Sequence, residues 1–253
     1  FELSISGGVA TVASTPTGIS KTAQNIWVLD VNISGTANGS ETLSVVPAAG
    51  NVIFDAAGNA ASTSQSNNTA SLTEKILPTV TNVTSTTSDG SYKQGQTIAI
   101  TVAFSEVVNV TGTPQLTLET GGSDAVVDYS SGTGSNTLTF NYTIGSGETS
   151  SDLDYKATSS LALNGGTIKD AALNNATLTL ASPGATNSLG DNKALIVDGA
   201  IPTIVSAVTG DHNADGTVDR LVITFSEQVD LTNVDNNNFT LTESAGGNPT
   251  IAS

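Results

Sequence analysis

The sequence lacks both cysteine and methionine throughout its 253 residues. Without cysteine the chain can form neither disulfides nor thiolate metal sites. Because domains above about 100 residues can fold on a hydrophobic core alone, the lack of disulfides does not exclude a secreted protein. Translation starts at methionine, so a chain that begins with Phe1 and contains no methionine is expected to be a processed product or an internal piece of a longer protein.

Basic residues and long apolar runs are also scarce. The chain has 7 Lys and Arg residues against 23 Asp and Glu residues, which gives a net charge of −16. A protein that follows nucleic-acid phosphates needs basic patches, so we expect no nucleic-acid partner. No apolar run approaches the roughly 18 residues of a transmembrane helix, which predicts no direct membrane insertion. The acidic excess favours solubility and cation binding.

Apolar residues alternate with polar ones in several short stretches. The clearest of them are residues 97–104, 137–144, 27–33 and 220–225. A period of two residues is typical of strands with one buried face. In the stretch 27–33 this period places Trp27 on the apolar face, so we expect Trp27 in the core and not stacked on a sugar ring. With Gly-, Asn- and Ser-rich turns between the strands, the pattern predicts an all-β sandwich.

Three short motifs occur twice along the chain. They are D-A-A-x-N at 55–59 and 170–174, L/I-P-T at 77–79 and 201–203, and F-S-E at 104–106 and 225–227. Such self-similarity at a fixed period is the signature of repeated structural units. F-S-E lies early in each unit, D-A-A-x-N lies late, and the proline opens the next unit. Proline suits the start of a strand because its missing N–H falls outside the ladder.

The repeats predict tandem immunoglobulin-like β-sandwich domains, one complete and two partial. We expect residues 78–199 to form the complete unit, 1–77 the C-terminal part of a preceding domain, and 200–253 the N-terminal part of a following one. A further match supports this division, because F-E-L-S with a Gly-Gly pair near the start resembles F-T-L-T with a Gly-Gly pair near the end. The chain therefore ends near the point in a domain at which it begins.

The middle unit also resembles a known repeat family. The resemblance rests on P-T-V-T-N-V at 78–83, V-A-F-S-E at 102–106, G-T-P-Q-L at 112–116 and L-A-L-N-G-G-T-I at 161–168. These segments are similar to the repeat of the Synechococcus swimming-motility surface protein, and similar units occur in giant bacterial adhesins. The flanking pieces resemble related bacterial immunoglobulin-like units. The resemblance implies an extracellular location at the bacterial cell surface and neighbouring immunoglobulin-like domains as partners.

One loop has the spacing of a calcium site. In D-H-N-A-D-G-T-V-D, oxygen ligands fall at positions 1, 3, 5, 7 and 9 and glycine falls at position 6, as in the first part of an EF-hand loop. The candidate ligands are Asp211, Asn213, Asp215, the carbonyl of Thr217, and Asp219. Position 12 is Val222 instead of a bidentate glutamate, so we expect a Ca²⁺ loop of modest affinity on a hairpin. The alternative is an acidic turn that binds only water and its own backbone.

A second set of acidic residues lies at the repeated landmarks. Two end the F-S-E motifs, two open the D-A-A-x-N motifs, and two precede the linker prolines by four residues. They are Glu106 and Glu227, Asp55 and Asp170, and Glu74 and Asp198. The positions loosely resemble the junctions of cadherin-like arrays, where Ca²⁺ stiffens the linkers. The alternative is that D-A-A-x-N is an Asx turn, which Asp and Asn favour.

No catalytic constellation is evident in the sequence. The only histidine, His212, has no apparent Ser or Cys partner, and no glycine-rich phosphate loop follows a strand. We therefore expect a non-catalytic extender segment of a large secreted surface protein, such as an adhesin, an S-layer-like protein or a filament. One alternative is a module that binds a glycan or a protein, with any ligand of the full-length protein recognised elsewhere. Another is a head-to-tail filament subunit, in which residues 200–253 of one copy complete residues 1–77 of the next.

Overall fold

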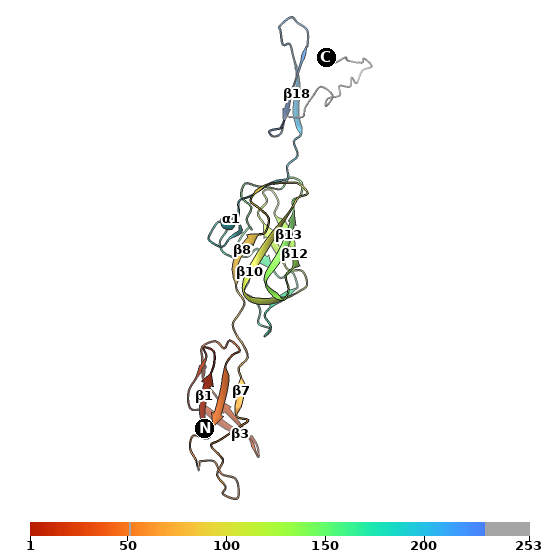
Figure 1. Ribbon diagram of the computed structural model, residues 1–253. Coiled ribbons are helices and arrows are strands. Elements are labelled where there is room, and N and C mark those ends of the chain that lie inside the picture. The colour runs from red at the N-terminus through yellow and green to blue at the C-terminus, as the bar shows by residue number, and fades with distance from the viewer. Residues whose placement is uncertain (51, 231–253) are drawn as a thin grey trace. The chain divides into compact units, whose positions relative to one another are not determined.

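The computed structural model describes residues 1–50 and 52–230 (Figure 1). Apart from one helical turn, α1 (Leu189–Asn192), the regular elements of this part of the chain are strands, most of them paired antiparallel. The predicted all-β class is confirmed. The chain divides into two compact units, Phe1–Gly199 and Ala200–Ser253. The expected boundary at 77/78 stays a prediction, although no strand pair in the described residues joins the two sides of it.

Residues 1–77 form three small antiparallel sheets. A three-stranded sheet has the order β1-β6-β7, and two pairs join β2 with β5 and β3 with β4. These strands are β1 (Glu2–Ser6), β2 (Thr11–Val12), β3 (Gly18–Ala23), β4 (Ile26–Asp30), β5 (Ile33–Ser34), β6 (Thr42–Val46) and β7 (Thr69–Ser71). Few of their apolar side chains are buried, with Leu3, Ala10 and Ala37 as the examples.

Residues 78–199 form two sheets around one hydrophobic core. The larger sheet has the order β15-β11-β12-β13-β10-β16, with β8 also paired to β10, and the smaller has the order β14-β17-β9. The strands are β8 (Val80–Ser85), β9 (Gly90–Lys93), β10 (Thr97–Thr111), β11 (Gln115–Leu118), β12 (Ala125–Ser131), β13 (Ser135–Thr143), β14 (Thr149–Ser150), β15 (Leu161–Ala162), β16 (Thr167–Lys169) and β17 (Leu195–Asp198). Both sheets contribute buried side chains to this core.

The alternating apolar residues of β10 and β13 form a large part of the core. The large apolar residues of the stretches 97–104 and 137–144 are at most 2% exposed, as the sequence predicts. They face one another across the sheet, with Ile100 opposite Phe140 and Val102 opposite Leu138. Each fully buried aliphatic or aromatic side chain of this kind contributes about 1.5–3 kcal/mol to folding.

Strand β10 is longer than the sequence pattern suggests. The alternation covers residues 97–104, but β10 continues through Glu106 to Thr111. The register with β13 shifts between Ala103 and Val108, so the strand bulges at this point. Beyond the bulge, β10 pairs with β16. Glu106 lies within this bulge, between the two paired parts of the strand. Bulges commonly redirect side chains out of the regular alternation.

The expectation that Trp27 lies in the core is wrong. Its side chain is 53% exposed, and Ile26 on the same strand is 55% exposed. The predicted stretch 27–33 is interrupted, because β4 ends at Asp30 and β5 begins at Ile33. β4 pairs only with β3 in the described residues, and Ile26, Trp27 and Val28 are exposed on both of its faces. Lys21 on β3 lies over the Trp27 ring, 5.6 Å from its centroid. Alternation identifies the apolar face of a strand, whereas burial also needs a partner for that face.

The second unit begins with a hairpin of β18 (Ile204–Gly210) and β19 (Arg220–Phe225). Its register repeats that of β8 with β10. Ile204 pairs with Phe225 as Val80 pairs with Phe104, and the register shifts next to this pair in both hairpins.

The residues that precede and follow the two hairpins repeat as well. The hydroxyl of Ser105 accepts the N–H of Thr79 at 3.0 Å, and the hydroxyl of Ser226 accepts that of Thr203 at 2.9 Å. The serine N–H donates back to the threonine carbonyl at 2.8 Å in each case. The repeated P-T and F-S-E motifs therefore meet in the same way in both units, which gives their sequence repetition a physical cause.

Candidate metal site

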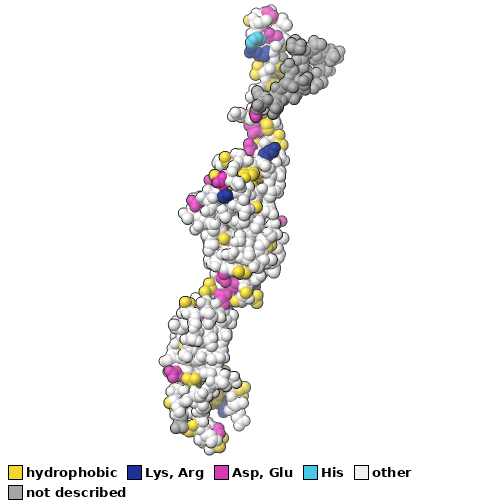
Figure 2. Space-filling model, in the orientation of Figure 1, with side chains coloured by type: hydrophobic (Ala, Val, Ile, Leu, Met, Phe, Trp, Pro, Cys, Tyr) yellow, Lys and Arg dark blue, Asp and Glu magenta, His cyan; other side chains and the backbone are white. Residues whose placement is uncertain are grey.

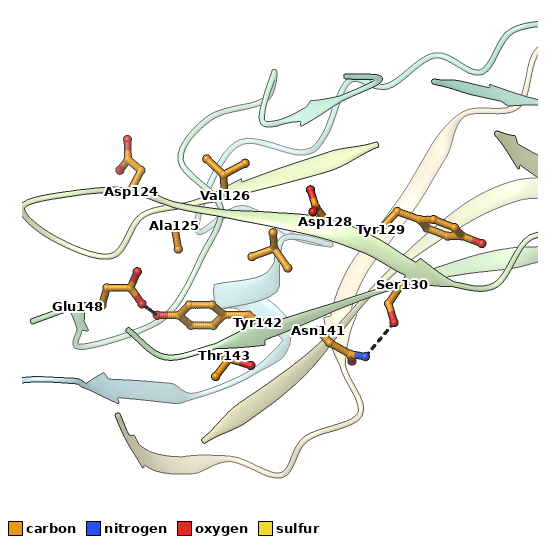
Figure 3. A pocket seen from close by; sticks show the side chains of 11 residues that line it. Asp124, Ala125, Val126, Asp128, Tyr129, Ser130, Asn141, Tyr142, Thr143 and Glu148 are labelled. Atoms are coloured by element: carbon orange, nitrogen blue, oxygen red, sulfur yellow. Dashed lines mark hydrogen bonds between the residues drawn. The ribbon is translucent and has the colours of Figure 1, made fainter. Parts of the chain in front are cut away.

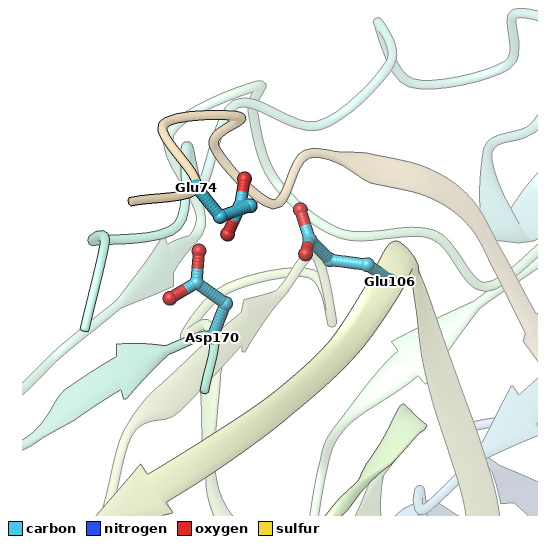
Figure 4. Close-up of side chains that lie close together, drawn as sticks. All are labelled: Glu74, Glu106 and Asp170. Atoms are coloured by element: carbon cyan, nitrogen blue, oxygen red, sulfur yellow. The ribbon is translucent and has the colours of Figure 1, made fainter. Parts of the chain in front are cut away.

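Three acidic side chains from distant parts of the sequence converge at one place in the first unit (Figure 4). Oxygen atoms of Glu74, Glu106 and Asp170 all lie within 4.8 Å of one another. Glu74 lies in the segment between β7 and β8, Glu106 lies at the bulge of β10, and Asp170 follows β16. This is the only group of three His, Cys, Asp or Glu side chains at such distances in residues 1–50 and 52–230. We call it the acidic triad.

The D-A-A-x-N turn holds Asp170 in place. The carboxylate of Asp170 accepts the backbone N–H of Asn174 at 2.8 Å and its side-chain amide at 2.7 Å. The same amide donates to the carboxylate and to the backbone carbonyl of Glu74, both at 3.2 Å. Asn174 thus connects the turn with the segment that carries Glu74. Asp170 itself is only 2% exposed.

The pKa values of two triad carboxyl groups are shifted in opposite directions. Burial raises the pKa of Glu106 above its ordinary value, and the nearby charges of Glu74 and Asp170 raise it further. Burial would also raise the pKa of Asp170, but hydrogen bonds from Asn174 hold it below the ordinary value. One oxygen of Glu106, Oε1, is buried and has no hydrogen-bond partner. The site therefore concentrates negative charge that this part of the protein does not neutralise.

Hard divalent cations suit such a donor set. Ca²⁺ takes six to eight oxygen ligands from carboxylates, carbonyls and water, whereas a site without Cys or His is a poor one for soft metals. The triad offers three carboxylates, and the Glu74 carbonyl accepts the same Asn174 amide as the carboxylates of Glu74 and Asp170. The residues present fit a calcium ion by their chemistry.

The remaining landmark acids do not join the triad. Asp55 lies in a turn that repeats that of Asp170, and its carboxylate accepts the backbone N–H of Asn59 at 2.8 Å and its side-chain amide at 2.8 Å. These bonds lower the pKa of Asp55. In both D-A-A-x-N motifs the Asp carboxylate accepts hydrogen bonds from the Asn, and calcium binding at either motif stays a prediction. Asp198 ends β17 in the first unit, and Glu227 follows β19 in the second. Glu227 Oε1, like that of Glu106, is buried and lacks a hydrogen-bond partner.

The loop 211–219 joins β18 to β19 and is exposed. The carboxylate of Asp211 accepts the N–H groups of Asp215 and Gly216, at 3.3 and 2.7 Å, and Asp215 accepts the N–H of Thr217 at 2.8 Å. The bond from Gly216 is the main cause that lowers the pKa of Asp211. Asp211, Asp215 and Asp219 do not come within 4.8 Å of one another as a group. The loop therefore has the hydrogen bonds of an acidic turn, and calcium binding there stays a prediction.

Sequence reasoning missed a buried carboxylate near the N-terminus. Glu41 is fully buried, and it accepts the N–H groups of Val9, Ala10 and Asn38 at 2.9, 3.2 and 3.0 Å. Burial would raise the pKa of Glu41, but these bonds hold it below its ordinary value. The carboxylate of Glu148 similarly accepts the N–H of Gly145, three positions before it, at 2.6 Å. The two segments, N-G-S-E at 38–41 and G-S-G-E at 145–148, share only the glutamate when aligned, so repetition gave no signal for either residue.

A polar groove of about 550 Å³ lies where β12 and β13 separate (Figure 3). Its acidic lining comes from Asp124, Asp128 and Glu148. The hydroxyl of Tyr142 donates to Glu148 at 2.8 Å, and the Tyr142 ring is 2% exposed, so it offers no face to a ligand. Tyr129, which is partly buried, also lines the groove, and its ring packs edge-on against Phe140 with the centroids 6.2 Å apart.

Comparisons with known proteins give this chain no relatives. No protein family, no curated protein and no solved structure matches it. No helix in the described residues is long and apolar enough to cross a membrane. In the view of Figure 2, acidic side chains predominate over basic ones, in keeping with the net charge of −16.

Proposed function

We propose that this chain is a non-catalytic extender segment of a large bacterial surface protein, built from tandem immunoglobulin-like domains and stiffened by Ca²⁺. The observation that carries the proposal is the convergence of Glu74, Glu106 and Asp170 within 4.8 Å. The repeated motifs, the acidic composition and the resemblance to bacterial surface repeats support the extracellular setting. Each repeat adds length, and a bound ion limits bending where the chain passes from one repeat to the next.

A cation would resolve the electrostatic conflict at the triad. Three carboxylates at this distance repel one another, and Glu106 Oε1 is buried without a donor. An unsatisfied buried oxygen destabilises a fold by about 1–3 kcal/mol, and more when it is charged. Ca²⁺ offers each carboxylate a strong electrostatic partner and replaces the missing donor.

The position of the triad explains how an ion would stiffen the protein. Glu74 belongs to the segment that leads from β7 into β8, whereas Glu106 and Asp170 belong to the bulge and turn of the following repeat. Coordination by all three would fix that segment to the repeat. Because the unfolded chain does not hold the three groups together, binding stabilises only the folded state.

Thermal unfolding with Ca²⁺ and with chelator tests the proposal. We expect calcium to raise Tm by several degrees, corresponding to about 2.7 kcal/mol at a hundredfold excess over Kd. Glu106→Gln should remove the increase. The matched control is Glu119→Gln, which changes charge by the same amount on an exposed side chain away from the triad. An equal increase of Tm in wild type and Glu106→Gln, or no increase in wild type, would contradict calcium binding at the triad.

A second, weaker calcium site at the loop 211–219 is a separate part of the proposal. Its support is the spacing of Asp211, Asn213, Asp215 and Asp219, with glycine at position 6. Extracellular calcium modules of this kind bind at about 10⁻⁴–10⁻³ M. The two sites can be separated, because one lies in each unit.

A further inference from the structure

We propose that Glu41 is a positioning residue for the acidic triad, because it fixes the loop 37–41 against which Glu74 lies. Glu41 would act through the backbone of this loop and not as a ligand. The inference rests on the proposed calcium site, since it assigns a supporting group of residues to that site. It also predicts a structural effect that can be measured without calcium.

The carboxylate of Glu41 holds two loops together, one after β1 and one before β6. One of its oxygens accepts the N–H groups of Val9 and Ala10 at 2.9 and 3.2 Å, and the other accepts that of Asn38 at 3.0 Å. Gly8 leaves room for this carboxylate, because a Cβ at that position would overlap it. Hydrogen bonds to a buried charged group are among the strong ones, so Glu41 fixes the course of the loop before β6.

This loop in turn holds the backbone on both sides of Glu74. The carbonyl of Glu41 accepts the N–H of Leu72 at 3.0 Å, and the carbonyl of Ala37 accepts that of Lys75 at 2.8 Å. Both bonds lie just beyond the paired residues of β6 and β7, so they extend this strand pair. Because Glu74 lies between the two bonded residues, the loop determines the position of its backbone.

Gly39 brings the loop 37–41 into contact with the Glu74 side chain. A Cβ at Gly39 would lie 3.1 Å from the Cβ of Glu74, which is closer than ordinary van der Waals contact. Gly39 has φ of 84°, a conformation that glycine adopts without strain. The carboxylate of the same Glu74 accepts the Asn174 amide that also donates to Asp170. Glu74 therefore connects the loop with the turn that carries Asp170.

The geometry of the triad thus depends on residues outside it. Glu106 and Asp170 belong to the repeat 78–199, whereas Glu74 precedes this repeat and depends on the loop for its position. Removal of the groups that orient a metal ligand weakens metal binding by about 10–100-fold. Loss of the Glu41 carboxylate should therefore weaken calcium binding, although all three triad carboxylates remain.

Hydrogen exchange and calorimetry of Glu41→Gln test the proposal. Glutamine keeps the size of the side chain but replaces one accepting oxygen by a donor. In chelator, the amides of Leu72 and Lys75 should exchange about tenfold faster than in wild type, because the loop that accepts them is no longer fixed. In isothermal titration the variant should bind Ca²⁺ about tenfold more weakly.

The matched control is Glu148→Gln, which makes the same change in a carboxylate that also accepts a loop N–H, in the following repeat. Glu148 supports no residue of the triad by the contacts described above. Its replacement should leave the calcium affinity unchanged. The exchange of the Leu72 and Lys75 amides should also equal that of wild type.

A second variant, Gly39→Ala, leaves Glu41 in place, so it tests the contact with Glu74 even if Glu41→Gln does not fold. The added methyl group should displace the Glu74 side chain and weaken calcium binding about tenfold. Gly58→Ala is its matched control. Gly58 has φ of 88°, so the backbone strain is similar, but beyond its chain neighbours no atom of the described residues lies within 4 Å of the added methyl. Both variants should lose stability, but only Gly39→Ala should lose affinity.

The outcomes separate this inference from the calcium site itself. A wild type that binds no Ca²⁺ would overturn the proposed function and the positioning role together. A wild type that binds Ca²⁺, with Glu41→Gln and Gly39→Ala binding it equally well, would overturn the positioning role alone. Unchanged exchange of the Leu72 and Lys75 amides in Glu41→Gln would also overturn that role, whatever the calcium affinities are.

Discussion

The side-chain amide of Asn174 donates to the carboxylate of Glu74 at 3.2 Å, although the two residues are 100 positions apart in the sequence. The same nitrogen donates to Asp170 at 2.7 Å. One uncharged side chain therefore connects two acids that would otherwise only repel each other. It also supports the acidic triad from outside, as residues around metal ligands commonly do.

Asn174→Ala should weaken calcium binding by about tenfold and destabilise the fold by about 1–3 kcal/mol. The reasons are the loss of ligand orientation and the loss of hydrogen bonds to charged groups. Isothermal titration and chemical denaturation measure the two effects. The matched control is Asn59→Ala, which removes the equivalent side chain from the exposed Asp55 turn. Its calcium affinity should be unchanged, and an equal loss in both variants would argue against a role at the triad.

Glu106→Gln should have opposite effects with and without calcium. In chelator it should stabilise the protein at neutral pH, because it removes a buried charge that lacks a partner. In calcium it should be less stable than wild type, because a ligand is lost. Denaturant titrations in both buffers measure this change of sign. They compare the free energies of unfolding of wild type and variant. The same sign in both buffers would contradict the prediction.

The stability of the calcium-free protein should also change with pH through Glu106. Its folded pKa is raised above the ordinary value of 4.5. The folded state therefore binds a proton that the unfolded state has already released, and this contribution to stability falls as pH rises from the ordinary value through the folded pKa. Comparison of wild type with Glu106→Gln across this window isolates the contribution. A difference between them that does not vary with pH would contradict the raised pKa.

Leu173→Gly should stabilise the protein by about 0.5–1 kcal/mol. Leu173 is 74% exposed and has φ of 71°, a left-handed conformation that costs a side-chain-bearing residue roughly 1–2 kcal/mol. Glycine avoids this cost but loses more chain entropy, which offsets part of the gain. The equivalent position of the other D-A-A-x-N turn is already Gly58, with φ of 88°. Leu173→Ala keeps the strain and is the control, so equal stabilities of the Gly and Ala variants would contradict the prediction.

Phe140→Ala and Trp27→Ala should differ greatly at protein concentrations where the chain is monomeric. Removal of the fully buried Phe140 ring should destabilise the middle repeat by about 3–5 kcal/mol. Removal of the half-exposed Trp27 side chain should cost well under that amount, because solvent already contacts it. Urea denaturation monitored by circular dichroism measures both. A comparable loss for Trp27 would show that β4 is covered in the free chain.

The sequence was sufficient for the strands and their faces in the complete repeat. The period of two over 97–104 and 137–144 identified the buried residues of β10 and β13, because one face of each strand packs into the core of the repeat. The period of two failed to predict the exposure of Trp27, because a single sequence does not say whether a second sheet covers the face of a strand. The landmark acids Glu74, Glu106 and Asp170 were identified as candidates from repetition. Their convergence depends on the bulge in β10 and on Asn174, which are properties of the folded chain.

One strand pair in the middle repeat should affect how the protein resists mechanical load. β17 is the last strand before Gly199, and it runs parallel to β9 over four residue pairs, from Leu195 opposite Gly90 to Asp198 opposite Lys93. A pull on Gly199 along the strand direction slides β17 past β9, so the hydrogen bonds of all four pairs must yield together. An antiparallel hairpin pulled at its open end would release them one at a time. The β9–β17 pair at the C-terminal end of the repeat should therefore resist a force that pulls along the chain.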